Sequence, residues 1–343
     1  MGTVSEVRTP ARPAATVAIP TFNGEAWLAD AIKSVLAQSA VDIELLVLDN
    51  ASTDGTAELV ARYAGDKRLV YRRNERNIGF AANALNASRL ARGEALLILG
   101  SDDRLELRFI EAGMAFLRAR PNVSMVHGPA AWIDAEGRRF GGTGHVWPPT
   151  TPGPQAMVQA FEAGFCFSTM LMRTAAIRAS GPLDESWQEI TDLWLFLRMC
   201  LAGNIGYLDD VLCEYRVHAD AMSMPMYSTN LMFRRQLAAA RECFAWPEAV
   251  AAGVGGDLPR AERAAARIAL QVLHMSRTVG IGRTVANFAE VLREVPQAAL
   301  WPRSWALFGL ALLPFGLTSA LRRYLRRRAM ARMQALPASP PAA

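Results

Sequence analysis

The chain has 343 residues, enough for one large domain with an additional segment, and its charge is unevenly distributed. Residues 1–222 carry 26 Asp/Glu and 21 Lys/Arg, a net charge of −5, whereas residues 223–343 carry 6 and 16, a net charge of +10. The four cysteines form no Cys-x-x-Cys pair, which excludes the common zinc and redox motifs and favours reduced, buried thiols.

The N-terminal half alternates short apolar runs with segments of helical spacing. Residues 1–15 have no apolar core, so we expect a flexible tail and no secretory signal. Strands are predicted to begin at Thr16, Ile43, Leu69 and Ala95, with helices over 25–38, from about 54, and over 80–90. Because the strand starts recur about every 26 residues, as in βαβ units, they predict a mainly parallel sheet flanked by helices.

The second half is less regular. A Gly- and Pro-rich stretch, 141–154, is expected to be a long functional loop. Around it we predict helices at 107–117 and 192–201 and strands at 123–126, 167–172, 205–208 and 211–216. From about residue 224 the spacing is helical with no strand candidate. These patterns predict an α/β domain over 16–223, in two halves (16–125 and 126–223), and a helical, basic extension over 224–343.

Two adjacent acids, Asp102 and Asp103, follow the wholly apolar run 96–99. Adjacent carboxylates repel each other unless a cation or hydrogen bonds offset the repulsion, so the pair suggests a hard divalent ion such as Mg²⁺ or Mn²⁺. The alternative is a solvated pair at a turn, with one Asp capping the helix that follows.

The position of other residues in the predicted sheet favours the first interpretation. Pro20, Asp49 and Asp102 all fall at carboxyl ends of parallel strands, where open α/β sheets bind ligands. Neither Gly-x-Gly-x-x-Gly after the first strand nor Gly-x-x-x-x-Gly-Lys-Ser/Thr occurs in the chain. A nucleotide would therefore be held by carboxylates and by a metal ion on its phosphates.

Several segments resemble, in order and spacing, the motifs of family 2 glycosyltransferases. They are 19–24 (Ile-Pro-Thr-Phe-Asn-Gly), 46–56, 77–83, 93–95, 101–103 (Ser-Asp-Asp), 181–186 and 215–218 (Tyr-Arg-Val-His). The resemblance covers about residues 16–223. It implies a GT-A fold and inverting transfer of a sugar from a nucleotide sugar.

The resemblance also implies roles for the residues at the sheet edge. Asp49 would contact the nucleotide base, Asp102 the ribose side of the donor, and Asp103 the metal ion. Pro20 would also line the donor site, and His218 would meet the diphosphate or the metal. The alternatives are a turn or capping role for Asp49 and a simple hydrogen-bonding role for His218.

An inverting transfer requires one base to accept the proton of the acceptor hydroxyl. The matching position is Asp192, at the start of the predicted helix. Here Thr191 stands where the family commonly has Glu, so Glu189 is a second candidate for the base. Asp192 could instead be a helix-start acid that the macrodipole favours. Weaker candidates for sugar or acceptor contacts are Trp147, Ser168 and Thr169, and Trp147 could equally be a packing residue.

The C-terminal segment suggests a membrane surface. Residues 304–321 contain no charge but include Gly309, Pro314 and Gly316, and six Arg and no acid follow between 322 and 332. Because nucleotide sugars are cytoplasmic, a single span would carry these Arg outward, against the positive-inside tendency. We therefore expect an interfacial or re-entrant segment on the cytoplasmic face of the inner membrane. The alternative is a helix packed on the catalytic domain, and nucleic acid is not expected.

These features predict a glycosyltransferase that moves a hexose or deoxyhexose from a UDP- or dTDP-sugar to a saccharide or lipid-linked acceptor, in cell-surface polysaccharide synthesis. Two alternatives stay open at this point. One is a non-catalytic module that binds a nucleotide sugar or a carbohydrate. The other is a sugar-phosphate nucleotidyltransferase, although residues 20–24 lack the Gly-rich phosphate loop of that class.

Overall fold

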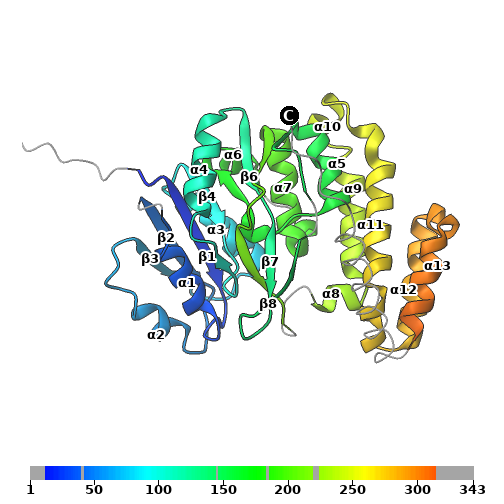
Figure 1. Cartoon of the computed structure of the whole chain (residues 1–343), viewed down its shortest axis with the longest axis horizontal. Coiled ribbons are helices and arrows are strands. Elements are labelled where there is room, and N and C mark those ends of the chain that lie inside the picture. Colours follow the sequence, from blue (N-terminus) through cyan, green and yellow to red (C-terminus); the bar gives the residue numbers. More distant parts are fainter. Residues whose placement is uncertain (1–11, 40–41, 144–145, 183–184, 219–223, 314–343) are drawn as a thin grey trace, which may run out of the picture. The chain divides into compact units, whose positions relative to one another are not determined.

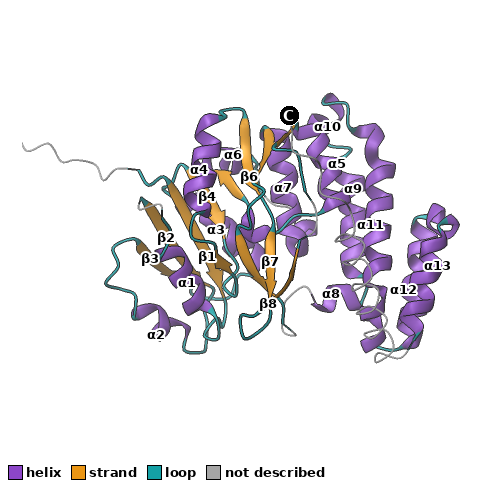
Figure 2. Cartoon of the chain, in the orientation of Figure 1, coloured by secondary structure: helices purple, strands orange, loops and turns teal. Residues whose placement is uncertain are grey.

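The computed structural model describes residues 12–39, 42–143, 146–182, 185–218 and 224–313 (Figure 1). Within them the chain forms two compact units: residues up to 218 together with 238–261, and residues 224–237 together with 262–313. The first is an α/β unit and the second is helical (Figure 2). The Arg-rich segment 322–332 and most of the predicted N-terminal tail lie outside the described residues.

The α/β unit contains a mixed, mainly parallel sheet of eight strands, as predicted. In spatial order these are β3 (Leu69–Arg73), β2 (Ile43–Asp49), β1 (Ala15–Thr21), β4 (Ala95–Ile98), β10 (Leu171–Arg173), β6 (Val123–His127), β11 (Asn204–Tyr207) and β9 (Thr150–Thr151). The first four strands are parallel, whereas β10 is antiparallel to both of its neighbours. A second sheet has the order β5 (Arg104–Leu105), β12 (Cys213–Arg216), β7 (Ala130–Ile133) and β8 (Arg139–Gly142).

Helices flank the large sheet and close its core (Figure 2). They are α1 (Leu28–Leu36), α2 (Thr56–Ala61), α3 (Phe80–Leu90), α4 (Phe109–Ala119), α5 (Gly153–Ala163), α6 (Thr174–Ala179) and α7 (Thr191–Ala202). Every residue of β1 and β2 is buried, which explains their near-continuous apolar sequences. Leu28 and Ile32 of α1 join Val17 of β1 in this core.

One strand prediction is wrong at its end: β1 does not stop before Pro20. The pairing of β1 with β4 ends at Ala18, whereas its pairing with β2 continues to Thr21 opposite Asp49. Pro20 therefore lies where the strand has only one neighbour, a position that tolerates a residue without an N–H group.

Two further predictions in the second half are corrected. The stretch 141–154 is not one loop, because it includes the end of β8, all of β9 and the start of α5. The predicted strand 167–172 begins instead as a short 3₁₀ turn, η1 (Phe167–Thr169), and only β10 is extended. Ser168 and Thr169 therefore project from a turn and not from a strand.

Residues 224–313 are helical, as the sequence predicts. The helices are α8 (Met224–Ser228), α9 (Leu231–Cys243), α10 (Pro247–Ala251), α11 (Leu258–Val272), α12 (Ile281–Glu294) and α13 (Pro302–Leu312). The helical unit has its own core, in which Phe233, Leu270 and Phe288 are buried. None of the helices in the described part of the chain is both long and apolar enough to cross a bilayer.

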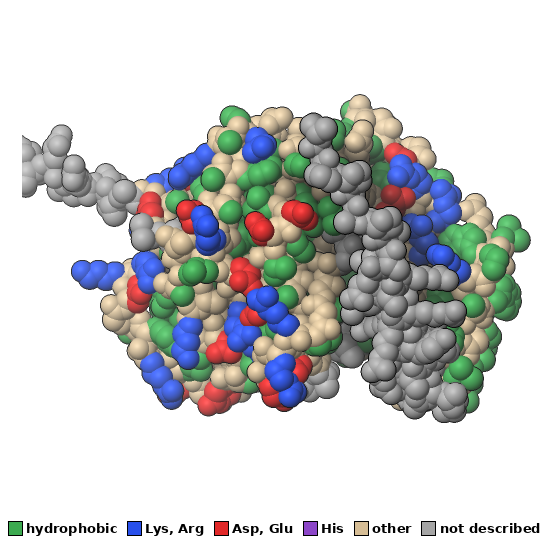
Figure 3. Space-filling model, in the orientation of Figure 1, with side chains coloured by type: hydrophobic (Ala, Val, Ile, Leu, Met, Phe, Trp, Pro, Cys, Tyr) green, Lys and Arg blue, Asp and Glu red, His purple; other side chains and the backbone are tan. Residues whose placement is uncertain are grey.

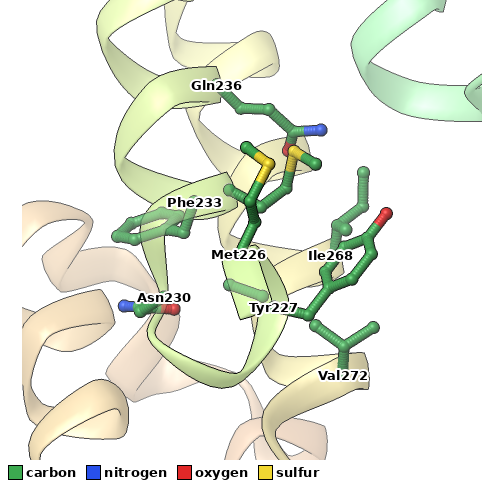
Figure 4. A pocket seen from close by; sticks show the side chains of 9 residues that line it. Met226, Tyr227, Asn230, Phe233, Gln236, Ile268 and Val272 are labelled. Atoms are coloured by element: carbon green, nitrogen blue, oxygen red, sulfur yellow. The ribbon is translucent and has the colours of Figure 1, made fainter. Parts of the chain in front are cut away.

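A narrow pocket lies inside the helical unit (Figure 4). Met226, Tyr227 and Phe233 approach it from the α8–α9 side, and Ile268 and Val272 from α11. Its volume of about 10 Å³ is close to that needed by one water molecule, so it is a packing defect and no substrate site.

Candidate active site

The loops that follow β1 and β2 are fastened to each other by side-chain hydrogen bonds. Asn23 accepts a hydrogen bond from Thr53 N at 2.8 Å, and its own N–H donates to Ser52 Oγ at 2.9 Å. Asn23 has a φ of 51°, a left-handed conformation that Asn tolerates better than most residues. These hydrogen bonds therefore hold the two loops in fixed positions at the carboxyl ends of β1 and β2.

Asp49 is fully buried at this edge and its two oxygens have partners. One oxygen accepts Ser52 N at 2.8 Å, and the other accepts the Tyr71 hydroxyl and lies 3.5 Å from the Arg73 guanidinium. Burial and the bond to Asp49 raise the pKa of Tyr71 to about 12, so the phenol stays a donor. Asp49 thus holds the turn at 50–52 in place, which is the structural alternative considered for it; a contact with a base stays a prediction.

The two acids of the pair have different surroundings. The Asp103 side chain is buried, and its oxygens accept hydrogen bonds from the Ser168 hydroxyl and from Arg216 N, the latter at 2.9 Å. Asp102 keeps 33% of its side chain exposed, and its Oδ2 lies 3.0 Å from His218 Nε2. Burial, and then the charge of Asp102, raise the pKa of Asp103 to about 7. The outward-facing acid is therefore Asp102.

A buried arginine supports this arrangement. The Arg216 side chain is 1% exposed and donates to the carbonyl oxygens of Asp102 and Ala135 at 2.8 and 2.9 Å. Trp27 lies beside it: the Arg216 guanidinium is 5.5 Å from the Trp27 ring, and the His218 ring is 4.4 Å from the same ring. Arg216 and Trp27 therefore fix the backbone at Asp102 and the plane of His218.

Asp192 occupies the first turn of α7, as predicted. Its Oδ1 accepts the N–H of Leu193 at 2.8 Å, and burial raises its pKa. Thr191 beside it is buried and donates its hydroxyl to Gln188 O at 2.8 Å. Glu189, the alternative base, is exposed in η2 (Glu185–Ile190). A raised pKa makes this carboxylate a stronger base, as the predicted role requires.

The weaker candidates have structural roles. Trp147 is buried, with its ring 4.7 Å from that of His127 and 5.5 Å from that of Phe196, so it packs the core. Thr169 donates to Gly128 O and Cys166 O. Ser168 is the hydroxyl that supports Asp103.

Sequence reasoning missed Arg216 and Trp27. Arg216 stands in the motif 215–218, of which only His218 had been given a role. Its neighbours in the sequence do not distinguish a buried guanidinium from a surface one, because its partners at 102 and 135 are far away in the chain.

A comparison with protein families gives a match over most of the α/β unit. A family model described as glycosyl transferase family 2 matches residues 16–180. Residues 16–180 therefore have the sequence pattern of a family 2 glycosyltransferase domain. The resemblance seen in the motifs, and the enzyme class that it implied, are thereby confirmed.

Curated relatives are consistent with this glycosyltransferase domain. EpsE of Bacillus subtilis, named as a glycosyltransferase, is 29% identical over 224 residues, 64% of this chain and 78% of EpsE. The abequosyltransferase RfbV of Salmonella typhimurium is 40% identical over 91 residues, which are 25% of this chain and 27% of RfbV.

Solved structures share the fold of the glycosyltransferase. Staphylococcus aureus TarS 1–349 in complex with UDP-GlcNAc has a TM-score of 0.55 at 18% identity, covering 87% of this chain and 86% of that one. The mannosyltransferase PcManGT of Pyrobaculum calidifontis, in complex with GDP-Man and Mn²⁺, has a TM-score of 0.52 at 19% identity, covering 91% and 87%. The predicted GT-A-type architecture is confirmed.

The side chains at this edge show whether the glycosyltransferase could coordinate a divalent ion. Among the residues that the structure describes, no group of three or more His, Cys, Asp or Glu side chains is arranged as a metal site. Asp102 and His218 supply two adjacent donors. Since Mg²⁺ is typically held by one or two carboxylates together with substrate phosphates, this pair fits an ion that is shared with a diphosphate.

Proposed function

We propose that the chain is an inverting glycosyltransferase that moves a sugar from a UDP- or dTDP-sugar to a saccharide or lipid-linked acceptor, with a divalent ion on the diphosphate. The observation that carries the proposal is the outward-facing Asp102 paired with His218 at 3.0 Å, at the carboxyl end of β4. Buried Arg216 holds both acids in place, because its backbone N–H donates to Asp103 and its side chain donates to the carbonyl oxygen of Asp102.

The ion's place within the acid pair follows from the hydrogen bonds. Mg²⁺ or Mn²⁺ would stabilise the charge that develops on the leaving diphosphate without a proton. Asp103, the residue first assigned to it, is buried and accepts hydrogen bonds from Ser168 and from Arg216 N, whereas the Asp102 side chain is 33% exposed. We therefore place the ion on Asp102 and His218, with Asp103 as the buried residue that orients Asp102.

The chemical step needs the base on the acceptor side. The acceptor oxygen would attack the anomeric carbon of the donor sugar. The bond between that carbon and the diphosphate oxygen would break, and the hydroxyl proton would pass to the Asp192 carboxylate. Burial raises the pKa of Asp192, which strengthens it as a base. Pro20 and Asp49 would form the floor of the nucleotide site, with Asp49 meeting the base at the turn it holds.

The test is a panel of UDP-, dTDP- and GDP-sugars, with release of the nucleoside diphosphate measured with Mg²⁺, with Mn²⁺ and with EDTA. We expect release from at least one UDP- or dTDP-sugar, lost in EDTA and restored by added metal. Turnover that EDTA does not change would contradict the metal site. Absence of turnover and of binding for the entire panel would contradict the donor class.

The acceptor class is supported by the names of the relatives. Chondroitin synthase of Escherichia coli and a glycosyltransferase of teichuronic acid biosynthesis, TuaG of Bacillus subtilis, match 62% and 32% of this chain. These names favour a role in building a cell-surface polysaccharide. The matches span 30% and 44% of those proteins, so neither name specifies the acceptor of this chain.

We further propose that the helical unit binds the cytoplasmic face of an anionic inner membrane. On α12, Ile281 and Val285 are 54% and 44% exposed, and Arg283 and Arg293 are exposed with them. On α13, Trp305 is 52% exposed, and the helix contains no acidic residue. Figure 3 shows hydrophobic side chains along the edge of the view that α12 and α13 occupy, with Arg side chains nearby.

A water-facing helix normally exposes polar side chains, whereas apolar residues with interspersed Arg are typical of interfacial helices. Sedimentation of the full chain with vesicles tests this assignment. We expect binding to phosphatidylglycerol vesicles that weakens with added salt, and little binding to phosphatidylcholine. Equal binding to both kinds of vesicle, or to neither, would contradict it.

A further inference from the structure

Residues 238–261 belong to the same compact unit as the large sheet, although residues 224–237 before them belong to the helical unit. They comprise the end of α9, all of α10 and the start of α11. The segment packs against α5, since the rings of Phe161 and Phe244 lie 6.0 Å apart and both residues are buried. It follows residue 180, where the match to the glycosyltransferase family ends. The family match therefore gives this segment no role.

Trp187 of η2 joins this segment to the residues that precede Asp192. Trp187 is 1% exposed, and its indole N–H donates to Glu242 Oε1 at 2.8 Å. A buried indole N–H needs an acceptor, and a bond to an ionised carboxylate is roughly twice as strong as a bond between neutral groups. The Trp187 ring also lies 5.6 Å from the ring of Trp246. Trp187 is thus held both by a directed hydrogen bond and by ring packing.

The same segment contacts α7 directly. The guanidinium of Arg198 is 5.2 Å from the Trp246 ring, a distance at which the cation is attracted to the ring face. Arg198 also lies 3.9 Å from the Glu248 carboxylate at the start of α10. Trp246 therefore contacts both η2, through Trp187, and α7, through Arg198.

These contacts flank the piece of backbone that carries the proposed base. η2 runs directly into α7, whose first turn holds Asp192. The Thr191 hydroxyl donates to Gln188 O, which connects the end of η2 to the start of the helix. The Asp192 carboxylate accepts a hydrogen bond from the N–H of its neighbour Leu193. Because this partner lies on the same turn, the carboxylate moves with the turn that carries it.

We infer that Trp187 and Glu242 are positioning residues for the general base. Their hydrogen bond holds η2, and with it the first turn of α7, so that Asp192 stays within reach of the acceptor oxygen. The inference rests on the proposed function, in which Asp192 takes the acceptor proton. A displacement of a reacting group by about 1 Å can cost about 10²-fold in rate. A bond that acts only through the backbone can therefore control kcat and leave the donor site unchanged.

Two substitutions remove this bond from opposite ends. Glu242→Ala removes the acceptor at an exposed position, and Trp187→Phe removes the donor while it keeps a ring against Trp246. The assay is release of nucleoside diphosphate from the UDP- and dTDP-sugars of the panel, with water as the acceptor, since water needs the same base. We expect kcat to fall about 10–100-fold in both variants. The donor KM and the metal concentration for half-maximal activity should not change.

Two control variants distinguish positioning from a general loss of structure. Glu242→Gln keeps an acceptor oxygen for the indole N–H and should retain most of the wild-type kcat. Glu58→Ala removes an exposed carboxylate from α2 and should change neither kcat nor KM. Equal losses of kcat in Glu242→Gln and Glu242→Ala would overturn the inference. A rise in the donor KM with unchanged kcat in both bond-breaking variants would overturn it as well.

A double-mutant cycle with Asp192→Asn tests whether the pair acts through the base. If Glu242 positions Asp192, Glu242→Ala should lower kcat in the wild-type chain and have little further effect in the Asp192→Asn chain. Equal fold-losses in the two chains would show that Glu242 acts independently of Asp192, which would overturn the inference.

The same measurements separate this inference from the proposed function. If the wild-type chain releases no nucleoside diphosphate from any donor, or if Asp192→Asn keeps the full rate, the proposed function is contradicted together with the base on which the inference rests. If turnover is lost in Asp192→Asn but unchanged in Glu242→Ala and Trp187→Phe, the inference alone is contradicted.

Discussion

The carboxyl edge of the large sheet and the surface of the helical unit use charged residues in opposite ways. At the sheet edge, Asp103 and Arg216 are buried, and their side chains form directed hydrogen bonds with other groups of the protein. On the helical unit, Arg283 and Arg293 are exposed between exposed apolar residues. The first region holds a few functional groups in fixed positions, whereas the second presents a surface that is both apolar and positively charged.

This difference determines what each region can recognise. Directed hydrogen bonds in a buried setting discriminate between ligands, since an unmatched polar group there costs about 1–3 kcal/mol. Exposed arginines near apolar side chains attract any anionic surface and are screened by salt. Substitutions at the sheet edge should therefore change the chemistry, and substitutions on the helical unit should change only where the chemistry takes place.

The largest effect is expected for Asp192→Asn. The amide keeps the shape and cannot take the acceptor proton, so kcat for transfer should fall by about 10²–10⁴-fold while the donor binds normally. Since burial raises the pKa of Asp192, the acidic limb of the wild-type kcat/KM profile should lie above the ordinary Asp value of 3.8. Activity should be lost as the pH falls through that limb, because the base becomes protonated.

Glu189→Gln is the matched control, an exposed carboxyl three residues earlier. It should keep both the rate and the pH profile. If Glu189→Gln loses the acidic limb and Asp192→Asn keeps it, the base is Glu189.

The next effect is expected for Asp102→Asn against Asp103→Asn. Removing the outward carboxylate should lower transfer by about 10²–10³-fold and raise the Mg²⁺ or Mn²⁺ concentration needed for half-maximal activity. Asp103→Asn should lower protein stability more than it changes metal dependence, because both oxygens of Asp103 are used inside the protein. Metal dependence lost in Asp103→Asn and kept in Asp102→Asn would restore Asp103 as the ligand.

The location of this site was predictable from sequence, and the division of roles within it was not. An apolar strand followed by two acids is a local signal, so Asp102 could be placed at the sheet edge. The burial of Asp103 depends on Ser168 and on Arg216, which lie 65 and 113 residues further along the chain. No spacing rule links such partners.

The missed helix α5 has a similar cause. Gly153 and Pro154 are typical of a loop, and the sequence was interpreted in that way. In the fold, a Cβ at Gly153 would collide with the carbonyl oxygen of Cys200 at the end of α7. The glycine is present because the two helices approach closely, a tertiary requirement that overrides its low helix propensity.

A smaller effect is expected for Ser168→Ala. The substitution removes the hydroxyl that donates to buried Asp103 and leaves a carboxylate oxygen without that partner. We expect the free energy of unfolding, measured with urea, to fall by about 1–3 kcal/mol. Ser88→Ala is the control, because Ser88 Oγ bonds only to Leu85 O within α3, and it should change stability by about 0.5 kcal/mol or less. Equal losses in both variants would mean that Ser168 does not support the acid.

The smallest effect on the chemistry is expected for the double variant Ile281→Ser and Val285→Ser. If α12 lies in the lipid interface, losing these half-exposed side chains should weaken binding to phosphatidylglycerol vesicles by about 1–2 kcal/mol, or roughly 5–30-fold. Val250→Ser is the matched control, since Val250 is 58% exposed but belongs to the α/β unit. Donor turnover in solution should be the same in all three proteins, because the substitutions leave the sheet edge intact. A loss of vesicle binding in Val250→Ser equal to that in the double variant would show that general surface hydrophobicity, and not the α12 face, binds the membrane.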